Sequence, residues 1–311
     1  MHRVDECLFA SVSSDINIIE DICSYTLQSG GKRFRPLILL LAARFCNYHG
    51  EKHIPLACVI EYLHTATLLH DDVIDHAEMR RGSSSANSMW GNQATILAGD
   101  FLFARSFAMA VEAHDLKVLE VIASTSKHLA EAEMFQVSKA DDPTITEEEY
   151  FFIIKNKTAS LIAASSRIGA LLGGVPEPQE KALETYGFNL GIAFQIMDDV
   201  LDYRSTEKEF GKAIGKDLQE GSFTLPFIES LQRSSPEDRE RMIHIVHKEE
   251  RSSEDLGLII KLIEQYGGTT YALEKADQYA RQAINALDIF NANEKKKPLI
   301  DLARFVVHRN Y

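Results

Sequence analysis

The apolar residues of this chain recur with the period of an α-helix over most of its length. Residues 54–69 read IPLACVIEYLHTATLL, and residues 94–121 and 150–172 show a similar apolar pattern. The sequence has no sustained alternation of apolar and polar residues and no Asn-Gly turn that would suggest a β-hairpin. The pattern predicts an all-α helical bundle of roughly ten or more helices.

Glycine and proline gather in short breaks between these helical stretches. The breaks cover residues 29–31, 47–55, 82–92, 140–146, 173–178, 211–226, 234–238 and 267–268. Each break separates segments of helical length, and no Gly/Ser linker or run of charges divides the chain. We therefore expect residues 1–311 to form a single domain, with the most apolar helices at its centre.

The composition is typical of a soluble globular protein, with 45% apolar and 25% charged residues. The net charge of −13 argues against nucleic acid as a partner. The longest uninterrupted apolar stretch, residues 37–43, is far shorter than the ~20 residues of a transmembrane span. The sequence begins without a secretory signal pattern, and its four cysteines lack the spacing of a zinc or disulfide framework. We expect a cytoplasmic protein.

Two apolar helical runs end in the same acidic motif, Asp-Asp-x-x-Asp. Residues 66–75 read ATLLHDDVID, and residues 193–202 read AFQIMDDVLD. On a helix, residues three or four apart are neighbours, so each motif brings its carboxylates together. The six acids are Asp71, Asp72, Asp75, Asp198, Asp199 and Asp202.

Carboxylates at this spacing repel one another, so we expect a cation to neutralise each motif. Ligands that are all oxygen suit a hard ion, and Mg²⁺ binds through one or two carboxylates together with phosphate oxygens and water. A solvated acidic face is the alternative, but such a face would not end a strongly apolar helical run. The sequence favours two matching metal-binding motifs that face one site.

Basic residues lie in separate clusters near these motifs. The clusters are GGKRFRP at residues 30–36, RRG at 80–82, KT at 157–158, and the pair Lys212 and Lys216. In an acidic protein, basic clusters beside metal carboxylates indicate an anion of high charge density, such as diphosphate. For residues 30–36 taken alone, an ordinary turn with solvated cations is the simpler interpretation.

Taken together, these motifs resemble those of the trans-type polyprenyl diphosphate synthases. The segments that carry the resemblance are GGKRFRP at 30–36, LLHDDVIDHAEMRRG at 68–82, GDFLFAR at 99–105, KTASL at 157–161, FQIMDDVLDY at 194–203 and GKDLQEGSFTLP at 215–226. The resemblance implies an isoprenoid synthase bundle with a central cavity, a homodimer, and a reaction that joins isopentenyl diphosphate to an allylic diphosphate (farnesyl or geranylgeranyl).

The resemblance also implies a role for each motif residue. The expected metal ligands are Asp71 and Asp75 for two Mg²⁺ ions and Asp198 for a third, supported by Asp72, Asp199 and Asp202. The cations expected around the allylic diphosphate are Arg80, Lys157, Lys212 and Lys216. The residues expected at isopentenyl diphosphate are Lys32, Arg35, His64 and Arg81. Those expected at the reacting centre are Thr158 and Gln195, with Phe194 against the apolar tail.

Two details qualify this resemblance. The chain has Ser222 where the family often has Lys, and our hypothesis is that Lys216 compensates. The motifs contain no obvious dedicated base, which fits a reaction in which the departing diphosphate takes the proton. His70 is expected to be a packed neighbour of the metal site.

The residues before the first aspartate motif predict the product length. In short-product relatives an aromatic residue commonly stands four or five positions before the motif, where this chain has Thr67 and Ala66. Leu63, eight positions before the motif, would also line the floor of the cavity, and Met134 and Phe135 are candidates for a deeper floor. Because Thr67 and Ala66 are small, we expect a long product of the hexaprenyl to octaprenyl class. The alternative is that Ala66 serves only close helix packing.

Three other interpretations stay open at this point. A class I terpene cyclase also carries an aspartate-rich helix, but its second metal motif usually has an Asn/Ser/Glu pattern. An inactive subunit of a heteromeric synthase would typically have lost aspartates that this chain keeps. A catalytic subunit that needs a different partner is the third. A long product is insoluble, so we expect peripheral membrane contact at its release.

Overall fold

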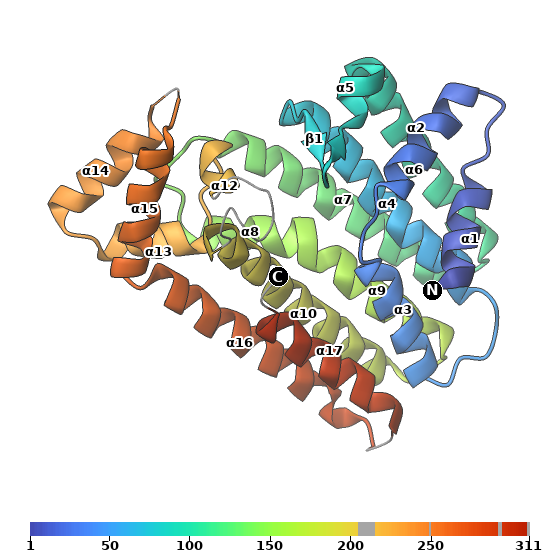
Figure 1. Cartoon of the computed structure of the whole chain (residues 1–311). Coiled ribbons are helices and arrows are strands. Elements are labelled where there is room, and N and C mark those ends of the chain that lie inside the picture. The colour runs from blue at the N-terminus through green and yellow to red at the C-terminus, as the bar shows by residue number, and fades with distance from the viewer. Residues whose placement is uncertain (205–214, 249, 292–293, 310–311) are drawn as a thin grey trace. The chain divides into compact units, whose positions relative to one another are not determined.

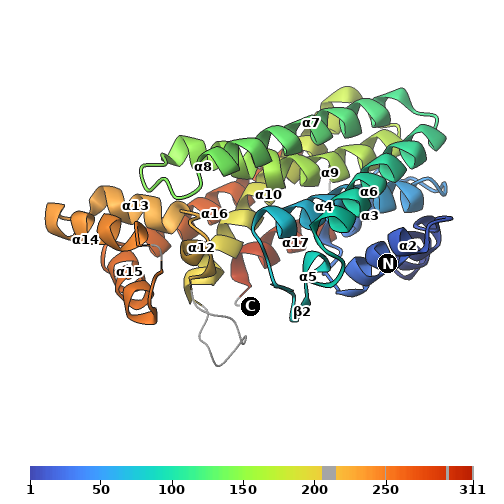
Figure 2. The same cartoon turned by 90° about the horizontal axis from the view of Figure 1, so that it is seen from above.

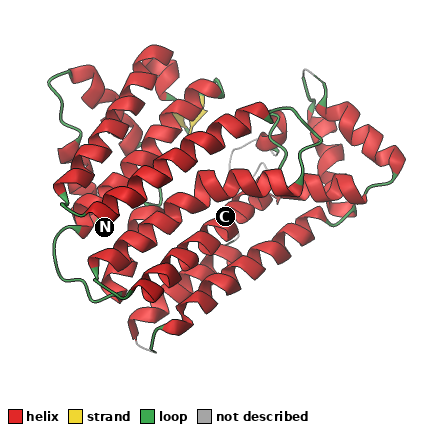
Figure 3. Cartoon of the chain, turned by 180° about the vertical axis from the view of Figure 1, so that it is seen from behind, coloured by secondary structure: helices red, strands yellow, loops and turns green. Residues whose placement is uncertain are grey.

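The computed structural model describes residues 1–204, 215–248, 250–291 and 294–309, and these residues are almost entirely helical (Figure 1). The prediction of an all-α protein with roughly ten or more helices is confirmed for the described residues. Among the described residues, β1 (Met79–Arg80) pairs antiparallel with β2 (Ser83–Ser84) in a short hairpin, which is coloured yellow in Figure 3. Strands of two residues carry no periodicity, so the sequence pattern could not predict them.

The chain divides into two compact units. Unit 1 comprises Met1–Ser126, Leu161–Gly187 and Ala292–Lys296, and unit 2 comprises Lys127–Ser160, Phe188–Asn291 and Lys297–Tyr311. The two aspartate motifs belong to different units. That residues 1–311 form one domain, and that the motifs face one another across a cavity, stay predictions of the sequence.

Unit 1 is built around one helix that is apolar on nearly every side. Its elements are α1 (His2–Ser11), α2 (Asn17–Gln28), α3 (Phe34–Phe45), α4 (His53–Ile74), the β1–β2 hairpin, α5 (Ala86–Trp90), α6 (Asn92–Glu112), the first part of α7 (Leu116–Ser138), most of α9 (Ser160–Leu172), the first part of α10 (Glu177–Arg204) and the 3-10 helix η3 (Glu294–Lys296). Ile60, Leu63 and Leu69 of α4 are fully buried, and Leu102 of α6 joins them in one hydrophobic core. A helix without a polar face is stable only inside such a core, which places the first aspartate motif at the end of a rigid element.

Unit 2 holds the second aspartate motif. Its elements are the second parts of α7 and α10, then α8 (Glu147–Ile154), the π-helix η1 (Lys155–Ala159), α12 (Lys216–Gln219), α13 (Leu225–Arg233), α14 (Pro236–Val246), α15 (Ser253–Gln265), α16 (Gly268–Ala286), the 3-10 helix η2 (Leu287–Ile289) and α17 (Lys297–His308). Figures 1 and 2 both show α13, α14 and α15 gathered at one end of unit 2, with α16 running away from them beside α17. Several helices in this unit begin where the sequence offers a cap, as Ser235 does for α14.

Two of the apolar stretches are less continuous than their pattern suggests. The stretch at residues 94–121 is interrupted between α6 and α7, where His114 adopts a left-handed backbone conformation with φ of 50°. The stretch at residues 150–172 contains the π-helix η1. Apolar periodicity predicts a helix but does not report a local change in its hydrogen-bonding pattern.

Helix α6 has the length and composition of a membrane-crossing helix, and 39% of its most apolar window is buried. A core helix of a soluble protein passes the same test, so this is weak evidence. The expectation that no segment spans a membrane therefore stays a prediction.

Candidate functional site

The first aspartate motif lies at the carboxyl end of α4. Asp71 and Asp72 are buried in the last turn, whereas Asp75 is the exposed residue that caps the helix. The carboxyl end of a helix carries a partial negative charge, which disfavours carboxylates there. Three acids at this end therefore repel both one another and the helix terminus. A bound cation would relieve that repulsion.

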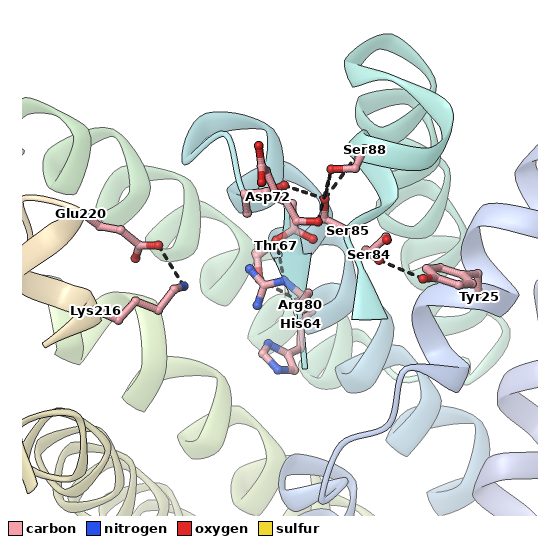
Figure 4. A network of polar contacts seen from close by, with 12 residues as sticks. Tyr25, His64, Thr67, Asp72, Arg80, Ser84, Ser85, Ser88, Lys216 and Glu220 are labelled. Atoms are coloured by element: carbon pink, nitrogen blue, oxygen red, sulfur yellow. Dashed lines mark hydrogen bonds and ion pairs between the residues drawn. The ribbon is translucent and has the colours of Figure 1, made fainter. Parts of the chain in front are cut away.

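Arg80 provides one positive charge at this motif. It lies in the β1–β2 hairpin that follows α4, and its Nε donates a hydrogen bond to Asp72 (Figure 4). A hydrogen bond from the backbone nitrogen of Ser85 to the carbonyl oxygen of Glu78 closes the hairpin at 2.9 Å. The structure thus joins Arg80 and Asp72, which the sequence assigned to the diphosphate and to the metal.

The residues expected at isopentenyl diphosphate lie in a strongly basic part of unit 1. Burial lowers the pKa of His64 well below its usual value, and nearby guanidinium groups lower it further. These groups belong to Arg35, Arg81, Arg80 and Arg33. An imidazole of such low basicity is poorly suited to abstract a proton, whereas the guanidinium groups around it suit an oxyanion.

The GGKRFRP and RRG clusters meet in the fold. A Cβ atom on Gly31 would lie 2.8 Å from Nη1 of Arg81, so glycine leaves the space that this guanidinium group uses. Burial lowers the pKa of Arg81. Lys32 is exposed beside Gly31, so this part of the turn places cations near one another.

Arg33 has a different task from its neighbours, which sequence analysis did not foresee. Its Nη1 donates to Oε1 of Glu61 at 2.8 Å and its Nη2 donates to the carbonyl oxygen of Leu27 at 2.7 Å. Glu61 is buried in α4, and a buried carboxylate requires such a partner. A charged residue inside an apolar helical run was the available signal. Arg33 fixes the basic turn against α4.

His70, next to Asp71 on α4, makes contacts with α6. Its Nε2 lies 3.3 Å from the carbonyl oxygen of Ile96 and 3.4 Å from a carboxylate oxygen of Asp100. A Cβ atom on Gly99 would lie 2.4 Å from this nitrogen, so glycine is required for the close approach. The GDFLFAR segment thereby holds the helix end that carries the first motif.

The proposed chain-length residues of α4 differ in exposure. Leu63 and Ala66 are fully buried in the core of unit 1, and the half-buried Thr67 donates its hydroxyl to the carbonyl of His64 at 2.8 Å. In unit 2, Met134 is 71% exposed and Phe135 packs against Phe152 with ring centroids 4.8 Å apart. The role of these residues in product length stays a prediction.

The second aspartate motif is connected to the predicted reacting-centre residues by hydrogen bonds. Thr158 donates its hydroxyl to Oε1 of Gln195 at 2.7 Å, and Nε2 of Gln195 donates to Asp199 at 2.8 Å. The hydroxyl of Tyr150 donates to the other carboxylate oxygen of Asp199 at 2.6 Å. Burial, with a smaller contribution from the charges of Asp198 and Asp202, outweighs these two hydrogen bonds and raises the pKa of Asp199 to about 7. Tyr150 was not identified from the sequence.

Lys157 and Thr158 project from the π-helix η1. A π-helical turn is rare and often occurs at functional sites, because the extra residue redirects side chains. Nζ of Lys157 lies 2.8 Å from Oε2 of Glu133 on α7. This ion pair was also not identified from the sequence, because its partners are far apart in the chain.

Asp202 is held by the segment that follows it. The backbone nitrogen of Asp217 donates to Oδ2 of Asp202 at 3.1 Å, and Gly215 donates to its carbonyl oxygen at 3.3 Å. Burial and the nearby Asp202 and Asp199 raise the pKa of Asp217 well above its usual value. Asp217 is thus a further acid of this cluster, missed because it stands outside the repeated motif.

The remaining predicted residues of unit 2 have partners of their own or lie outside the described residues. Lys216 pairs with Glu220 at 2.9 Å (Figure 4). Arg309 donates to Asp198 at 2.6 Å and to the carbonyl oxygen of Phe194 at 2.9 Å, and its guanidinium group lies 4.3 Å from the centre of the Phe194 ring. Lys212 lies outside the described residues.

Within the parts of the chain that the structure describes, no three His, Cys, Asp or Glu side chains form a complete metal-binding group. Mg²⁺ usually keeps several waters and takes phosphate oxygens as ligands beside one or two carboxylates. The carboxylates of both motifs are therefore suitable as partial ligand sets.

Comparison with known proteins decides the family. The polyprenyl synthetase family model matches residues 16–263, which is most of the chain. The chain belongs to the polyprenyl synthetase family. As the motifs indicated, it is a prenyltransferase of the all-α isoprenoid synthase fold that condenses isopentenyl diphosphate with an allylic diphosphate.

Individual relatives cover the whole chain. It is 38% identical over 311 residues to an octaprenyl diphosphate synthase of Haemophilus influenzae, covering 100% of this chain and 94% of that protein. It is 36% identical over 311 residues to heptaprenyl diphosphate synthase component 2 of Geobacillus stearothermophilus, covering 99% and 95%. A solved structure of a Caulobacter crescentus polyprenyl synthase, complexed with calcium and isoprenyl diphosphate, matches with a TM-score of 0.94 at 39% identity, covering 99% of this chain and 94% of that one.

Proposed function

We propose that this prenyltransferase makes a long all-trans polyprenyl diphosphate of the hexaprenyl to octaprenyl class. The small residues Ala66 and Thr67 before the first aspartate motif carry this proposal. The names of the octaprenyl and heptaprenyl relatives support it. Farnesyl or geranylgeranyl diphosphate is the proposed starter.

The metal of this reaction is proposed to be Mg²⁺, with three ions per active site. Asp71, Asp75 and Asp198 would hold them, and the crowding of acids at the end of α4 supports a cation there. The ions would neutralise the charge that develops on diphosphate as the allylic C–O bond breaks. The calcium in the Caulobacter relative is a hard divalent ion of the same kind.

The chain's own residues have distinct tasks in this proposal. Arg80, Lys157 and Lys216 bind the oxygens of the allylic diphosphate, with Lys212 as a further candidate. His64, Arg81, Lys32 and Arg35 bind isopentenyl diphosphate in the basic part of unit 1. Thr158 and Gln195 orient the reacting end of the prenyl chain, and Phe194 contacts its tail. His64 is too weakly basic to act as the base. The proton that the isopentenyl unit loses after condensation is therefore proposed to pass to the departing diphosphate.

A second copy of this chain is the proposed partner. Helix α6 exposes Leu97 at 63% and Val111 at 56%, with Ile96 also exposed. A long apolar helix with such residues on its surface suits a self-complementary interface. A heteromeric enzyme is the second candidate, because one relative is named as a component of a heptaprenyl diphosphate synthase.

A cytoplasmic location is proposed on the state of the cysteines, because all four are free and free thiols persist in reducing compartments. The product would be insoluble in water, so we propose peripheral contact with a membrane at its release. Nucleic acid is not among the proposed partners, given the net charge of −13.

The chain-length proposal is tested by placing an aromatic ring before the first motif. Ala66→Phe should shorten the product sharply, because the ring would occupy the path of the growing prenyl chain. Radiolabelled products would be separated by reversed-phase chromatography, with Ala66→Ser as the control of nearly unchanged size. Ala66 is buried, so a Phe at this position could unfold the protein. Thr67→Phe, at a half-buried position, therefore provides a second variant. An unchanged product from a folded, active aromatic variant would contradict the assignment.

A further inference from the structure

Helix α12 holds the last acid of the second aspartate motif through its backbone. The nitrogen of Asp217 donates to Oδ2 of Asp202 at 3.1 Å, and the nitrogen of Gly215 donates to the carbonyl oxygen of the same residue at 3.3 Å. A displacement of α12 would therefore move or release the carboxylate of Asp202. The four residues of α12 are too few to hold a fixed position unaided.

Arg251 supplies the missing support. Its Nη1 donates to the carbonyl oxygens of Leu218 at 2.7 Å and of Gln219 at 3.0 Å, which lie at the carboxyl end of α12. Its Nε donates to the carbonyl oxygen of Val246 at 3.2 Å, at the end of α14. The side chain is only 8% exposed. The planar guanidinium group offers five N–H donors in a fixed geometry, so it joins the ends of two helices rigidly.

Asp141 completes the support from a third segment. Its Oδ1 accepts a hydrogen bond from Nη2 of Arg251 at 3.1 Å, and its backbone nitrogen donates to the carbonyl oxygen of Gly221 at 3.0 Å. Gly221 has φ of 72°, and a Cβ atom there would lie 2.1 Å from Oδ1 of Asp141. Glycine is thus required for this approach. The contacts connect Arg251 to both sides of the turn that follows α12.

We propose that Arg251 is a positioning residue for the second aspartate motif. By fixing α12, it keeps the Asp217 amide on Asp202 and so holds that carboxylate in the orientation that supports a divalent cation. The inference rests on the proposed metal-binding function of the motif. Residues that orient metal ligands in this way typically change metal affinity 10–100-fold when they are replaced.

Arg239 offers a matched control within the same unit. Its Nε donates to the carbonyl oxygen of Leu231 at 3.0 Å and its Nη2 to that of Gln232 at 2.8 Å, near the end of α13. Arg239 thus performs the same kind of backbone support, but for α13 and not for α12 or the aspartate motif. An effect on metal binding that is specific to Arg251 separates positioning from general stabilisation.

The test measures divalent-cation binding directly in the full chain. Mn²⁺ serves as the probe, and electron paramagnetic resonance reports the free ion in titrations of wild type, Arg251→Gln, Arg251→Lys and Arg239→Gln. We expect Arg251→Gln to weaken Mn²⁺ binding about 10-fold, Arg251→Lys to weaken it less, and Arg239→Gln to leave it within a factor of two. The Mg²⁺ concentration for half-maximal turnover should rise in parallel, with the KM for isopentenyl diphosphate unchanged.

An Asp198→Asn variant separates the two ways in which this inference can fail. If wild type does not bind Mn²⁺, or if Asp198→Asn binds it equally well, the proposed metal function of the second motif is wrong, and the inference with it. If Asp198→Asn weakens binding but Arg251→Gln does not, only the positioning role is overturned. Equal weakening by Arg239→Gln also overturns it. Should Arg251→Gln fail to fold, Arg251→Lys and Asp141→Asn provide the same comparison.

Discussion

The carboxyl group of Asp199 is buried in unit 2 beside two further acids of its own motif. Two donors, Tyr150 and Gln195, favour its ionised form, but burial outweighs them and raises its pKa to about 7. Such a site costs stability in the absence of a cation, because the ionised form loses its hydration. At the scale of single residues, the second aspartate motif therefore holds an electrostatically unfavourable carboxylate, whose cost a bound divalent ion would reduce.

The electrostatic cost of this buried carboxylate predicts how the free energy of unfolding responds to Asp199→Asn when EDTA removes divalent ions. A raised pKa in the folded state means that stability is lost as pH rises from about 4 to about 7, since the unfolded state releases its proton first. Asp199→Asn has no charge at this position and escapes this loss. The hydroxyl oxygen of Tyr150 can accept a hydrogen bond from the side-chain NH₂ group of the new asparagine. We expect it to be more stable than wild type by on the order of 3 kcal/mol at pH 8, with little difference at pH 4.

Urea unfolding of both proteins, followed by circular dichroism at pH 4 and pH 8, checks this expectation. A variant that is less stable than wild type at pH 8, or a gain that does not depend on pH, would show that the buried charge is not the source of this cost.

At the scale of the element, local sequence signals determine where several helices begin. Thr146 starts α8 with a capping box, in which its side chain accepts from the nitrogen of Glu149 at 3.2 Å and Glu149 accepts from the nitrogen of Thr146 at 2.8 Å. This helix leads directly into η1, which carries Lys157 and Thr158. The cap thus affects the order of the segment that presents both residues.

Removal of this cap has a measurable cost. Thr146→Ala should lower the free energy of unfolding by about 1 kcal/mol, the usual effect of losing a side-chain N-cap. Amide hydrogen exchange at residues 147–150 should accelerate, because the first turn of α8 loses a partner. Ser124→Ala, at an exposed position inside α7, is the control: it should slightly raise the free energy of unfolding, because Ala favours the helix, and leave exchange at residues 147–150 unchanged. Unchanged exchange in Thr146→Ala would contradict a capping role.

Much of the fold could be predicted at this scale because helical periodicity and caps are local. The residues of the aspartate motifs could be identified for the same reason, since their spacing along one helix sets their faces. Arg251, Arg309 and Glu133 could not be identified, because their partners come from distant parts of the chain. Asp217 was hidden because its importance comes from burial beside Asp202, which spacing does not report.

At the scale of the whole molecule, the exposed apolar residues of α6 bear on assembly. Leu97→Glu should raise the dissociation constant of the proposed homodimer at least about 10-fold, because a charge would be buried in an apolar interface. Light scattering after size-exclusion chromatography would measure the mass across a dilution series. Leu258→Glu, at a 38% exposed position on α15, is the matched control and should leave the dimer intact. A wild-type monomer, or equal loss in both variants, would contradict this interface.

The central claim is that this chain by itself elongates an allylic diphosphate to a long polyprenyl diphosphate with Mg²⁺. The most direct measurement incubates the purified full chain with Mg²⁺, radiolabelled isopentenyl diphosphate and farnesyl diphosphate, and determines the products by chromatography. We predict all-trans products of hexaprenyl to octaprenyl length, and no product when EDTA removes the metal. A cyclised hydrocarbon, a product that stops at geranylgeranyl diphosphate, or no elongation without a second protein would contradict the account.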